Sequence, residues 1–168
     1  MRDDSDVSAS PTPAGELVTF HAMPAGEPPA SDLLEAMVSE VSELYGGRIE
    51  GPGLPTASPQ ELTPPNGVCL VGLLDGTAVT VGAVKRFEPG VAEIKRMYVT
   101  PQVRGRGLSR ALLLALENAA RGLGFTRVRL DTGPDQPRAK ALYLSTGYTE
   151  IADYNGNPFA SFWGEKTL

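Results

Sequence analysis

The chain contains one cysteine and one histidine, Cys69 and His21, among its 168 residues. One cysteine excludes an internal disulfide, and the two residues are too few for a Cys/His zinc cluster. Cys69 lies in the apolar run 68–73, so we expect a small buried hydrophobe rather than a nucleophile. We expect His21 to be a polar residue near the end of a strand. Cysteine–histidine catalysis is therefore excluded unless these two residues meet in the fold.

Long apolar runs and a basic leader segment are also missing. No run approaches about 20 apolar residues, so we expect no membrane span. Residues 1–6 are acidic, whereas a secretory signal begins basic and continues apolar. These absences predict a cytoplasmic protein. Residues 1–15 are polar and rich in Asp, Ser and Pro, which predicts a disordered tail before a single domain, residues 16–168.

Positive charge is scarce overall but concentrated in one segment. The net charge is -5, which argues against a nucleic-acid partner. Between Lys95 and Lys140, however, there are ten basic residues and only three acidic ones. This local excess predicts a small anionic ligand bound near the segment.

The spacing of apolar residues predicts a mixed α/β fold. Ser31 or Asp32 can cap a first helix that ends near residue 45, and helical spacing recurs over 108–123 and 137–146. Apolar, β-branched runs predict strands over residues 17–21, 68–73, 78–86, 91–99 and 127–130, and a closing hairpin of 149–154 and 160–166. The runs within 68–99 should form an antiparallel meander. Because a helix connects 91–99 to 127–130, those two strands should be parallel.

A glycine-rich turn, residues 102–107, separates the strand 91–99 from the helix 108–123. Its sequence is Gln102-Val103-Arg104-Gly105-Arg106-Gly107. The glycines allow a tight turn, and the following helix start adds unpaired N–H groups and a positive dipole end. The glycine turn therefore predicts a site for a phosphorylated ligand.

Three familiar sites do not fit this pattern. A Rossmann dinucleotide turn needs a third glycine where this chain has Arg110, and the Gly-Lys-Ser/Thr of a P-loop is absent. Asp131-Thr132-Gly133 is similar to an aspartic protease loop, but no second copy supplies the partner carboxylate.

The glycine turn instead resembles the Q/R-x-x-G-x-G/A signature of the GNAT superfamily of acyl-CoA N-acyltransferases. Residues 93–101 resemble that family's fourth strand. Two further segments are similar to its late helix end and last strand: Ala141-Leu142-Tyr143 with Gly147-Tyr148, and Phe162-x-x-x-Lys166-x-Leu168. The resemblance implies a GNAT fold over residues 16–168. That fold has a mixed central sheet flanked by helices, with an antiparallel N-terminal meander, a parallel pair at the coenzyme A loop and a closing C-terminal hairpin.

The resemblance also implies a coenzyme A site and no metal. Backbone N–H groups from Arg104 to Ser109 would hold the pyrophosphate, and Val99 N–H would face the thioester carbonyl. In the family, the main chain of the preceding strand pairs with the pantetheine arm. The implied cofactor-binding residues are Met97, Tyr98, Val99, Gln102, Val103, Arg104, Gly105, Arg106, Gly107, Leu108 and Ser109.

Two residues match catalytic positions in members of the family. Glu93 is the candidate general base, with a strand salt bridge as the alternative role. Tyr143 is the candidate donor to the departing thiolate, with packing as the alternative. Asp131 or Asp135 would meet a cationic substrate or serve as surface charge or caps, and Tyr154 with the turn 155–158 would line the acceptor cleft or only form a turn.

The sequence therefore predicts an N-acetyltransferase. It would move an acetyl group from acetyl-CoA directly to a primary amine of a small molecule or peptide, without a covalent intermediate, because Cys69 has no partnering base. The alternative is a non-catalytic acyl-CoA-binding module, and an NAD(P) oxidoreductase is a weaker third interpretation. The acceptor and acyl-chain specificity stay open, and the sequence is compatible with a homodimer without fixing the oligomeric state.

Overall fold

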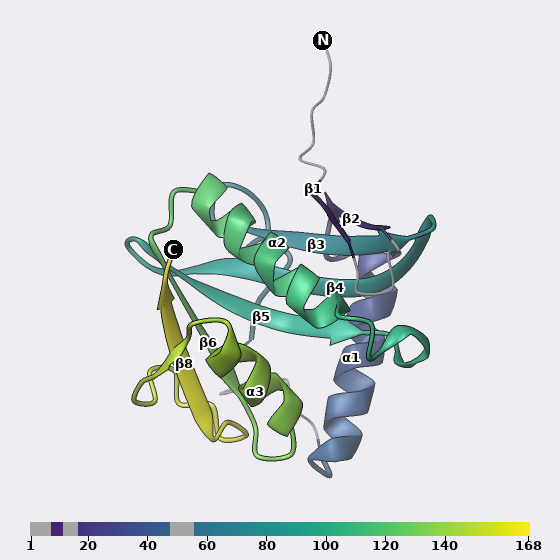
Figure 1. Cartoon of the computed structure of the whole chain (residues 1–168). Coiled ribbons are helices and arrows are strands. Elements are labelled where there is room, and N and C mark those ends of the chain that lie inside the picture. The colour runs from purple at the N-terminus through teal and green to yellow at the C-terminus, as the bar shows by residue number, and fades with distance from the viewer. Residues whose placement is uncertain (1–7, 12–16, 48–55) are drawn as a thin grey trace.

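The computed structural model describes residues 8–11, 17–47 and 56–168. Its strands form one mixed eight-stranded sheet in the order β1-β2-β3-β4-β5-β6-β8-β7 (Figure 1). Neighbouring strands are antiparallel except β5 and β6, which are parallel. The strands are β1 (Ser8–Pro11), β2 (Leu17–Ala22), β3 (Gly67–Leu74), β4 (Thr77–Glu88), β5 (Val91–Val99), β6 (Arg127–Thr132), β7 (Thr149–Glu150) and β8 (Phe162–Thr167).

Helices cover both faces of the sheet. α1 (Ala30–Leu44) packs on one face, whereas α2 (Leu108–Gly122) and α3 (Pro137–Ser145) pack on the other (Figure 1). Each face of the sheet has its own hydrophobic core. Side chains alternate along a strand, so β3 contributes to both: Val68 and Leu70 pack on the α2 side, and Cys69 packs on the α1 side. Burial raises the pKa of the Cys69 thiol to about 11, which keeps it protonated and agrees with its expected role as a buried hydrophobe.

The predicted topology is confirmed in its main features. The antiparallel meander of β3, β4 and β5, the parallel β5–β6 pair and the antiparallel β7–β8 pair are all present. The expected strand 149–154 is much shorter, however, because only Thr149–Glu150 pairs with β8. Beyond it the chain turns inward, and the side chains of Tyr154 and Asn155 bond to Glu93 of β5.

Two expectations at element ends are wrong. Ser8–Pro11 is not part of a tail, because it pairs antiparallel with β2 and satisfies the main-chain groups on that strand's edge. The rest of the expected tail, residues 1–7 and 12–15, lies outside the described residues. α1 begins at Ala30 with Pro29 at the N-cap, so Ser31 and Asp32 lie inside its first turn rather than capping it. Asp32 still complements the helix dipole there.

The feature that positions the site is the separation of β5 from β6. Their pairing is limited, among the described residues, to Val91–Arg127, Ala92–Val128 and Glu93–Arg129. Further along β5 the pairing with β4 shifts register, and Arg96 adopts a positive φ of 59°. Such a bulge bends a strand and increases its twist. The two parallel strands therefore diverge after Glu93 and leave an opening between them.

Candidate active site

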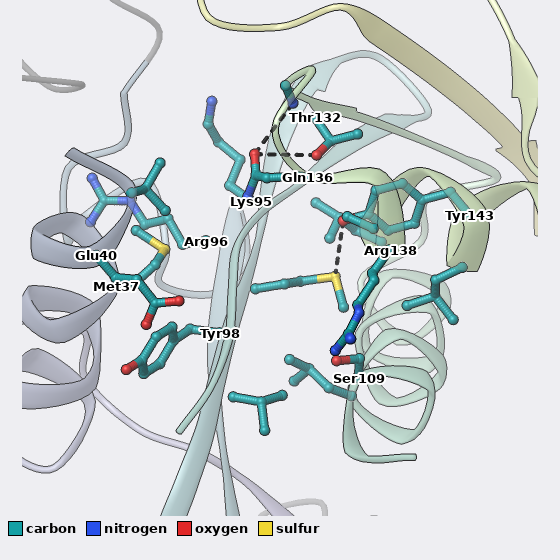
Figure 2. Close-up of a pocket in the computed structure, with 18 of the residues that line it drawn as sticks. Met37, Glu40, Lys95, Arg96, Tyr98, Ser109, Thr132, Gln136, Arg138 and Tyr143 are labelled. Carbon is teal, nitrogen blue, oxygen red and sulfur yellow. Dashed lines mark hydrogen bonds between the residues drawn. The ribbon is translucent and has the colours of Figure 1, made fainter. Parts of the chain in front are cut away.

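A cavity of about 840 Å³ occupies this opening. Figure 2 shows its walls: α1 on one side, β5 in the centre, and α3 with the start of α2 on the other. Most of the predicted site residues line it together, whereas Gln102 and Arg106 are not among its described lining residues. The predicted site residues that line the cavity are Glu93, Met97, Tyr98, Val99, Val103, Arg104, Gly105, Gly107, Leu108, Ser109 and Tyr143.

The glycine turn has the conformation that its sequence predicts. Gly105 has a φ of +78°, and Gly107, the N-cap of α2, has a φ of +80°. A Cβ at Gly105 would meet no atom within 4 Å, so its backbone angle rather than lack of space requires glycine. The first N–H bonded inside α2 belongs to Ala111, which donates to Gly107 O at 3.2 Å. The N–H groups of the preceding helical residues, such as Ser109, have no acceptor within the helix.

The N–H groups of Val103 and Arg104, which precede the glycines, already donate hydrogen bonds within the protein. Residues 101–103 form a short 3-10 turn in which Val103 N donates to Thr100 O at 3.2 Å and Arg104 N donates to Pro101 O at 3.4 Å. The N–H of Arg104, the first of the series expected to hold the pyrophosphate, therefore already has an acceptor within the protein.

Two of the arginines that line the cavity, Arg104 and Arg138, point in different directions. Arg104 Nη2 donates to Glu40 Oε2 of α1 at 2.8 Å, and Arg104 Nε donates to Val99 O at 2.9 Å. Its side chain thus faces α1. Arg138 of α3, in contrast, extends across the cavity toward Ser109 at the start of α2 (Figure 2). The sequence marked Arg138 only as one charge in the basic segment.

The main chain of Val99 faces the opening. Thr100 N donates to Val79 O of β4 at 2.9 Å, and successive N–H groups along a strand point in opposite directions. The N–H of Val99 therefore points away from β4. Tyr98 differs from the expectation, because its carbonyl oxygen accepts a hydrogen bond from Thr80 Oγ1 of β4. The ring of Tyr98 points toward α1 and Glu40 (Figure 2).

Tyr143 lies in the middle of the cavity wall. Its side chain is buried, stacks on Phe162 with ring centroids 6.5 Å apart, and donates from its hydroxyl to Met97 Sδ at 3.7 Å (Figure 2). Burial, and to a smaller extent the nearby Asp131, raises the pKa of Tyr143. The hydroxyl is therefore a proton-bearing donor throughout the neutral range.

Glu93 lies at the point where β5 and β6 separate, and it is only 4% exposed. Oε2 accepts hydrogen bonds from Tyr154 Oη at 2.7 Å and Asn155 Nδ2 at 3.1 Å, while Oε1 pairs with Lys95 Nζ at 3.3 Å. The salt bridge considered from the sequence is present, and both carboxylate oxygens are engaged. Burial and the charge of Glu93 raise the pKa of Tyr154, which keeps it a donor.

Asn155 connects Glu93 to a second carboxylate. Its Nδ2 also donates to Asp131 Oδ2, and Trp163 Nε1 donates to Asn155 Oδ1 at 2.9 Å. Asn157 Nδ2 donates to Asp131 Oδ1 at 3.2 Å. Burial raises the pKa of Asp131. The turn 155–158 therefore does more than reverse the chain: its amide side chains orient a pair of carboxylates, which no local sequence signal indicates.

The end of α1 closes the same part of the cavity. Tyr45 Oη donates to Gln136 Oε1 at 3.2 Å, and that oxygen also accepts from Thr132 Oγ1 and Gly133 N, both at 3.3 Å (Figure 2). The Tyr45 ring lies 5.9 Å from the ring of Phe159, centroid to centroid. Tyr45 is the C-cap of α1, and no sequence signal marked it as a residue of the site.

Two further findings bear on the class of protein. Among the described residues, no group of three or more His, Cys, Asp or Glu side chains is placed to hold a metal ion. None of the helices in the same part of the chain is long and apolar enough to cross a membrane.

The cavity thus brings together a glycine turn at a helix start, the end of β5, the Tyr143 side chain and two carboxylates. A sequence model of the Acetyltransferase (GNAT) family matches residues 34–148, more than half of the chain. The chain belongs to this family and is an acyltransferase, which agrees with the predicted fold and enzyme class.

Known relatives support this assignment over most of the chain. An IAA acetyltransferase of Azospirillum brasilense is 32% identical over 148 residues, which cover 86% of this chain and 96% of the relative. A protein of Klebsiella pneumoniae assigned as an acyl-CoA N-acyltransferase is 31% identical, with a TM-score of 0.71 and coverage of 90% and 97%. A GNAT family acetyltransferase of Elizabethkingia anophelis with acetyl-CoA bound shares the fold, with a TM-score of 0.65, 17% identity and coverage of 90% and 98%.

Proposed function

We propose that this protein transfers an acetyl group from acetyl-CoA to a primary amine of a small molecule or peptide within a ternary complex. One observation carries the proposal: residues of the glycine turn, Tyr143 and the carboxylates Glu93 and Asp131 all line a single cavity. The anionic end of acetyl-CoA suits the turn, and a cationic acceptor suits the carboxylates. The solved structure of the family with acetyl-CoA bound supports the choice of acyl donor.

At the end of the cavity near the glycine turn, main-chain N–H groups and one arginine side chain would bind the phosphates. The N–H groups after Arg104, on Gly105 and at the start of α2, would hold the pyrophosphate. Arg138 of α3 would add a bidentate contact, because its side chain points toward Ser109 at the start of α2 (Figure 2). Val99 N–H would donate to the thioester oxygen as charge develops on it.

The chemical step needs a neutral amine and a leaving thiolate. The substrate ammonium gives one proton to the carboxylate network that contains Glu93, and the freed nitrogen lone pair attacks the acetyl carbon. That attack forms the C–N bond, and collapse of the tetrahedral intermediate then breaks the C–S bond; the nitrogen gives up its second proton, which the departing sulfur takes directly or through Tyr143. Tyr143 would donate its hydroxyl proton or a hydrogen bond to the departing sulfur, since it already donates to Met97 Sδ. Tyr154, Asn155 and Lys95 hold Glu93 in place. Its role would therefore be to accept the substrate proton within a fixed hydrogen-bond network.

The test measures release of free coenzyme A thiol from acetyl-CoA across a panel of primary amines. We expect amine-dependent release and acetylated product by mass spectrometry. Gly105→Val should weaken acetyl-CoA binding about tenfold or more, because a β-branched residue resists a φ of +78°. Gly76→Val, in the β3–β4 turn at the same φ of +78°, is the matched control and should not change that affinity. Equal affinity of the Gly105 variant and the unmodified protein would contradict the proposed phosphate site.

A further inference from the structure

We propose that the acceptor is a primary amine attached to an apolar, aromatic-type body, with its ammonium group on Asp131 and its body against Tyr45 and Phe159. This inference rests on the proposed acetyltransferase function and names the substrate class of the same cavity.

The charges around Asp131 leave room for one more cation. Glu93, Asp131 and Lys95 form a cluster with two carboxylates and one ammonium group. Lys95 Nζ pairs with Glu93 Oε1 at 3.3 Å. Asp131, in contrast, accepts hydrogen bonds from the neutral amides of Asn155 and Asn157, and the ion pairs among the described residues include none at Asp131. The cluster therefore carries one net negative charge, which a substrate ammonium would neutralise.

The position of Asp131 suits an amine that is about to react. It lies next to the end of β6, where β5 and β6 have separated, and it lines the cavity. Its charge contributes to the raised pKa of Tyr143, so the two groups share one electrostatic environment. The raised pKa of Asp131 itself is also consistent with a partly buried carboxylate that lacks a full counter-charge.

The wall beside this carboxylate is apolar. Tyr45 and Phe159 are in tilted ring contact, and the last turns of α1 add Met37, Val41 and Leu44 to the cavity lining. Leu44 is 47% exposed, and it is the one strongly exposed large hydrophobic residue of the described chain that lines the cavity. An exposed apolar side chain beside an aromatic pair favours a ligand that covers them.

The same arrangement disfavours other amines. Glu40 on this wall is held by Arg104 and Glu93 by Lys95, and the other carboxylate of the lining, Asp135, is exposed. The second ammonium group of a polyamine would therefore lack a buried partner. The carboxylate of an amino acid would lie beside Asp131 and be repelled. A monoamine with a compact aromatic or branched alkyl body satisfies both ends of the site.

The experiment compares 2-phenylethylamine, spermidine and phenylalanine as acceptors, by initial rates of coenzyme A release. We expect 2-phenylethylamine to have the highest kcat/KM, by about tenfold or more. Asp131→Asn should raise its KM about 30-fold, because a charged hydrogen bond is lost, and should leave acetyl-CoA affinity unchanged. The control, Asp75→Asn, removes an equal charge from the exposed β3–β4 turn and should change neither quantity, since asparagine tolerates the φ of 49° there.

Calorimetry with the coenzyme A complex separates this inference from the proposed function. Binding of 2-phenylethylamine that Asp131→Asn abolishes would support the acceptor class even without turnover. A higher kcat/KM for spermidine or phenylalanine, or an Asp131→Asn variant with unchanged KM, would overturn the inference while leaving acetyl transfer intact. Absence of both turnover and amine binding would also overturn it. Failure to bind acetyl-CoA would instead count against the proposed function.

Discussion

Arg104 of the glycine turn donates to Glu40 of α1 at 2.8 Å and so joins the phosphate end of the cavity to the helix that forms its acceptor wall. The two side chains are 39% and 44% exposed, so this ion pair contributes only about 0.5 kcal/mol to stability. Its consequence is orientation: the Arg104 guanidinium is turned away from the N–H groups that start α2.

The first prediction contrasts this arginine with Arg138. Arg104→Met should weaken acetyl-CoA binding less than about threefold, because its charge is committed to Glu40. Arg138→Met should weaken it about tenfold, because that side chain reaches the start of α2. Isothermal titration with acetyl-CoA measures both. The opposite order of affinities would show that Arg104 leaves Glu40 to bind phosphate.

The second prediction concerns the departing thiolate. Tyr143→Phe keeps the ring that stacks on Phe162 and removes only the hydroxyl that donates to Met97 Sδ. A thiolate is already a fair leaving group, so kcat should fall about tenfold, less than is typical of general acid catalysis. Steady-state kinetics at saturating acetyl-CoA give kcat, and thermal unfolding checks the fold. An unchanged kcat would reduce Tyr143 to a packing residue.

Local signals predicted the backbone conformation of the glycine turn and the order of the elements around it. The backbone angles of Gly105 and Gly107, the meander and the crossover helix depend on residue types close together in the sequence. The side-chain part depends on distant contacts. Tyr45 meets Gln136, 91 residues later, and Glu93 meets Asn155, 62 residues later. No periodicity or turn signal encodes such pairs.

Glu117 shows the same limit in the core. Helical periodicity placed it off the apolar stripe of α2, yet it is only 2% exposed. Its Oε1 accepts from Tyr148 Oη at 3.0 Å, and Lys166 Nζ donates to both carboxylate oxygens at 3.1 and 3.0 Å. These partners lie 31 and 49 residues further along the chain, so only the assembled sheet makes a buried carboxylate tolerable there.

The third prediction separates the two roles of Glu93. Glu93→Gln leaves Lys95, 12% exposed, without its counter-charge, so the free energy of unfolding should fall by about 3 kcal/mol. If Glu93 also accepts a proton from the substrate amine in the reaction, kcat of the folded variant should fall about 100-fold. Urea unfolding and steady-state kinetics are measured on the same preparation. Lower stability with an unchanged kcat would make Glu93 a purely structural ion pair.

The fourth prediction concerns pH. Asp131 is faced by Glu93, Lys95, Tyr143 and the amides of the turn 155–158, and burial raises its pKa above the ordinary 3.8. If the ionised form binds the acceptor, kcat/KM should fall on acidification at a pH above 3.8. In a pH profile of kcat/KM, Asp131→Asn should remove this fall at acidic pH. If the variant still shows the fall, a group other than Asp131 causes it.

The raised pKa also fixes the sign of its effect on stability. Between 3.8 and the folded-state pKa, the folded chain binds more protons at Asp131 than the unfolded chain. The contribution of this residue to the free energy of unfolding is therefore greatest below pH 3.8 and is lost as the pH rises through the folded-state value. Urea unfolding at a series of pH values should show that Asp131→Asn removes this component.

The last prediction tests the α1 wall by shape rather than charge. A Cβ at Gly133 would overlap the Tyr45 hydroxyl and crowd Phe159 O, so Gly133→Ala should displace Tyr45 from Gln136. We expect the KM for 2-phenylethylamine to rise about tenfold, since a misplaced apolar wall costs about 1–3 kcal/mol. The glycine turn is remote from this contact, so acetyl-CoA affinity should not change. Tyr45→Ala should relieve the part of the crowding that involves Tyr45, so adding Gly133→Ala to Tyr45→Ala should raise KM by less than about tenfold. Independent, additive effects of the two substitutions would show that Gly133 acts on the acceptor through some other contact.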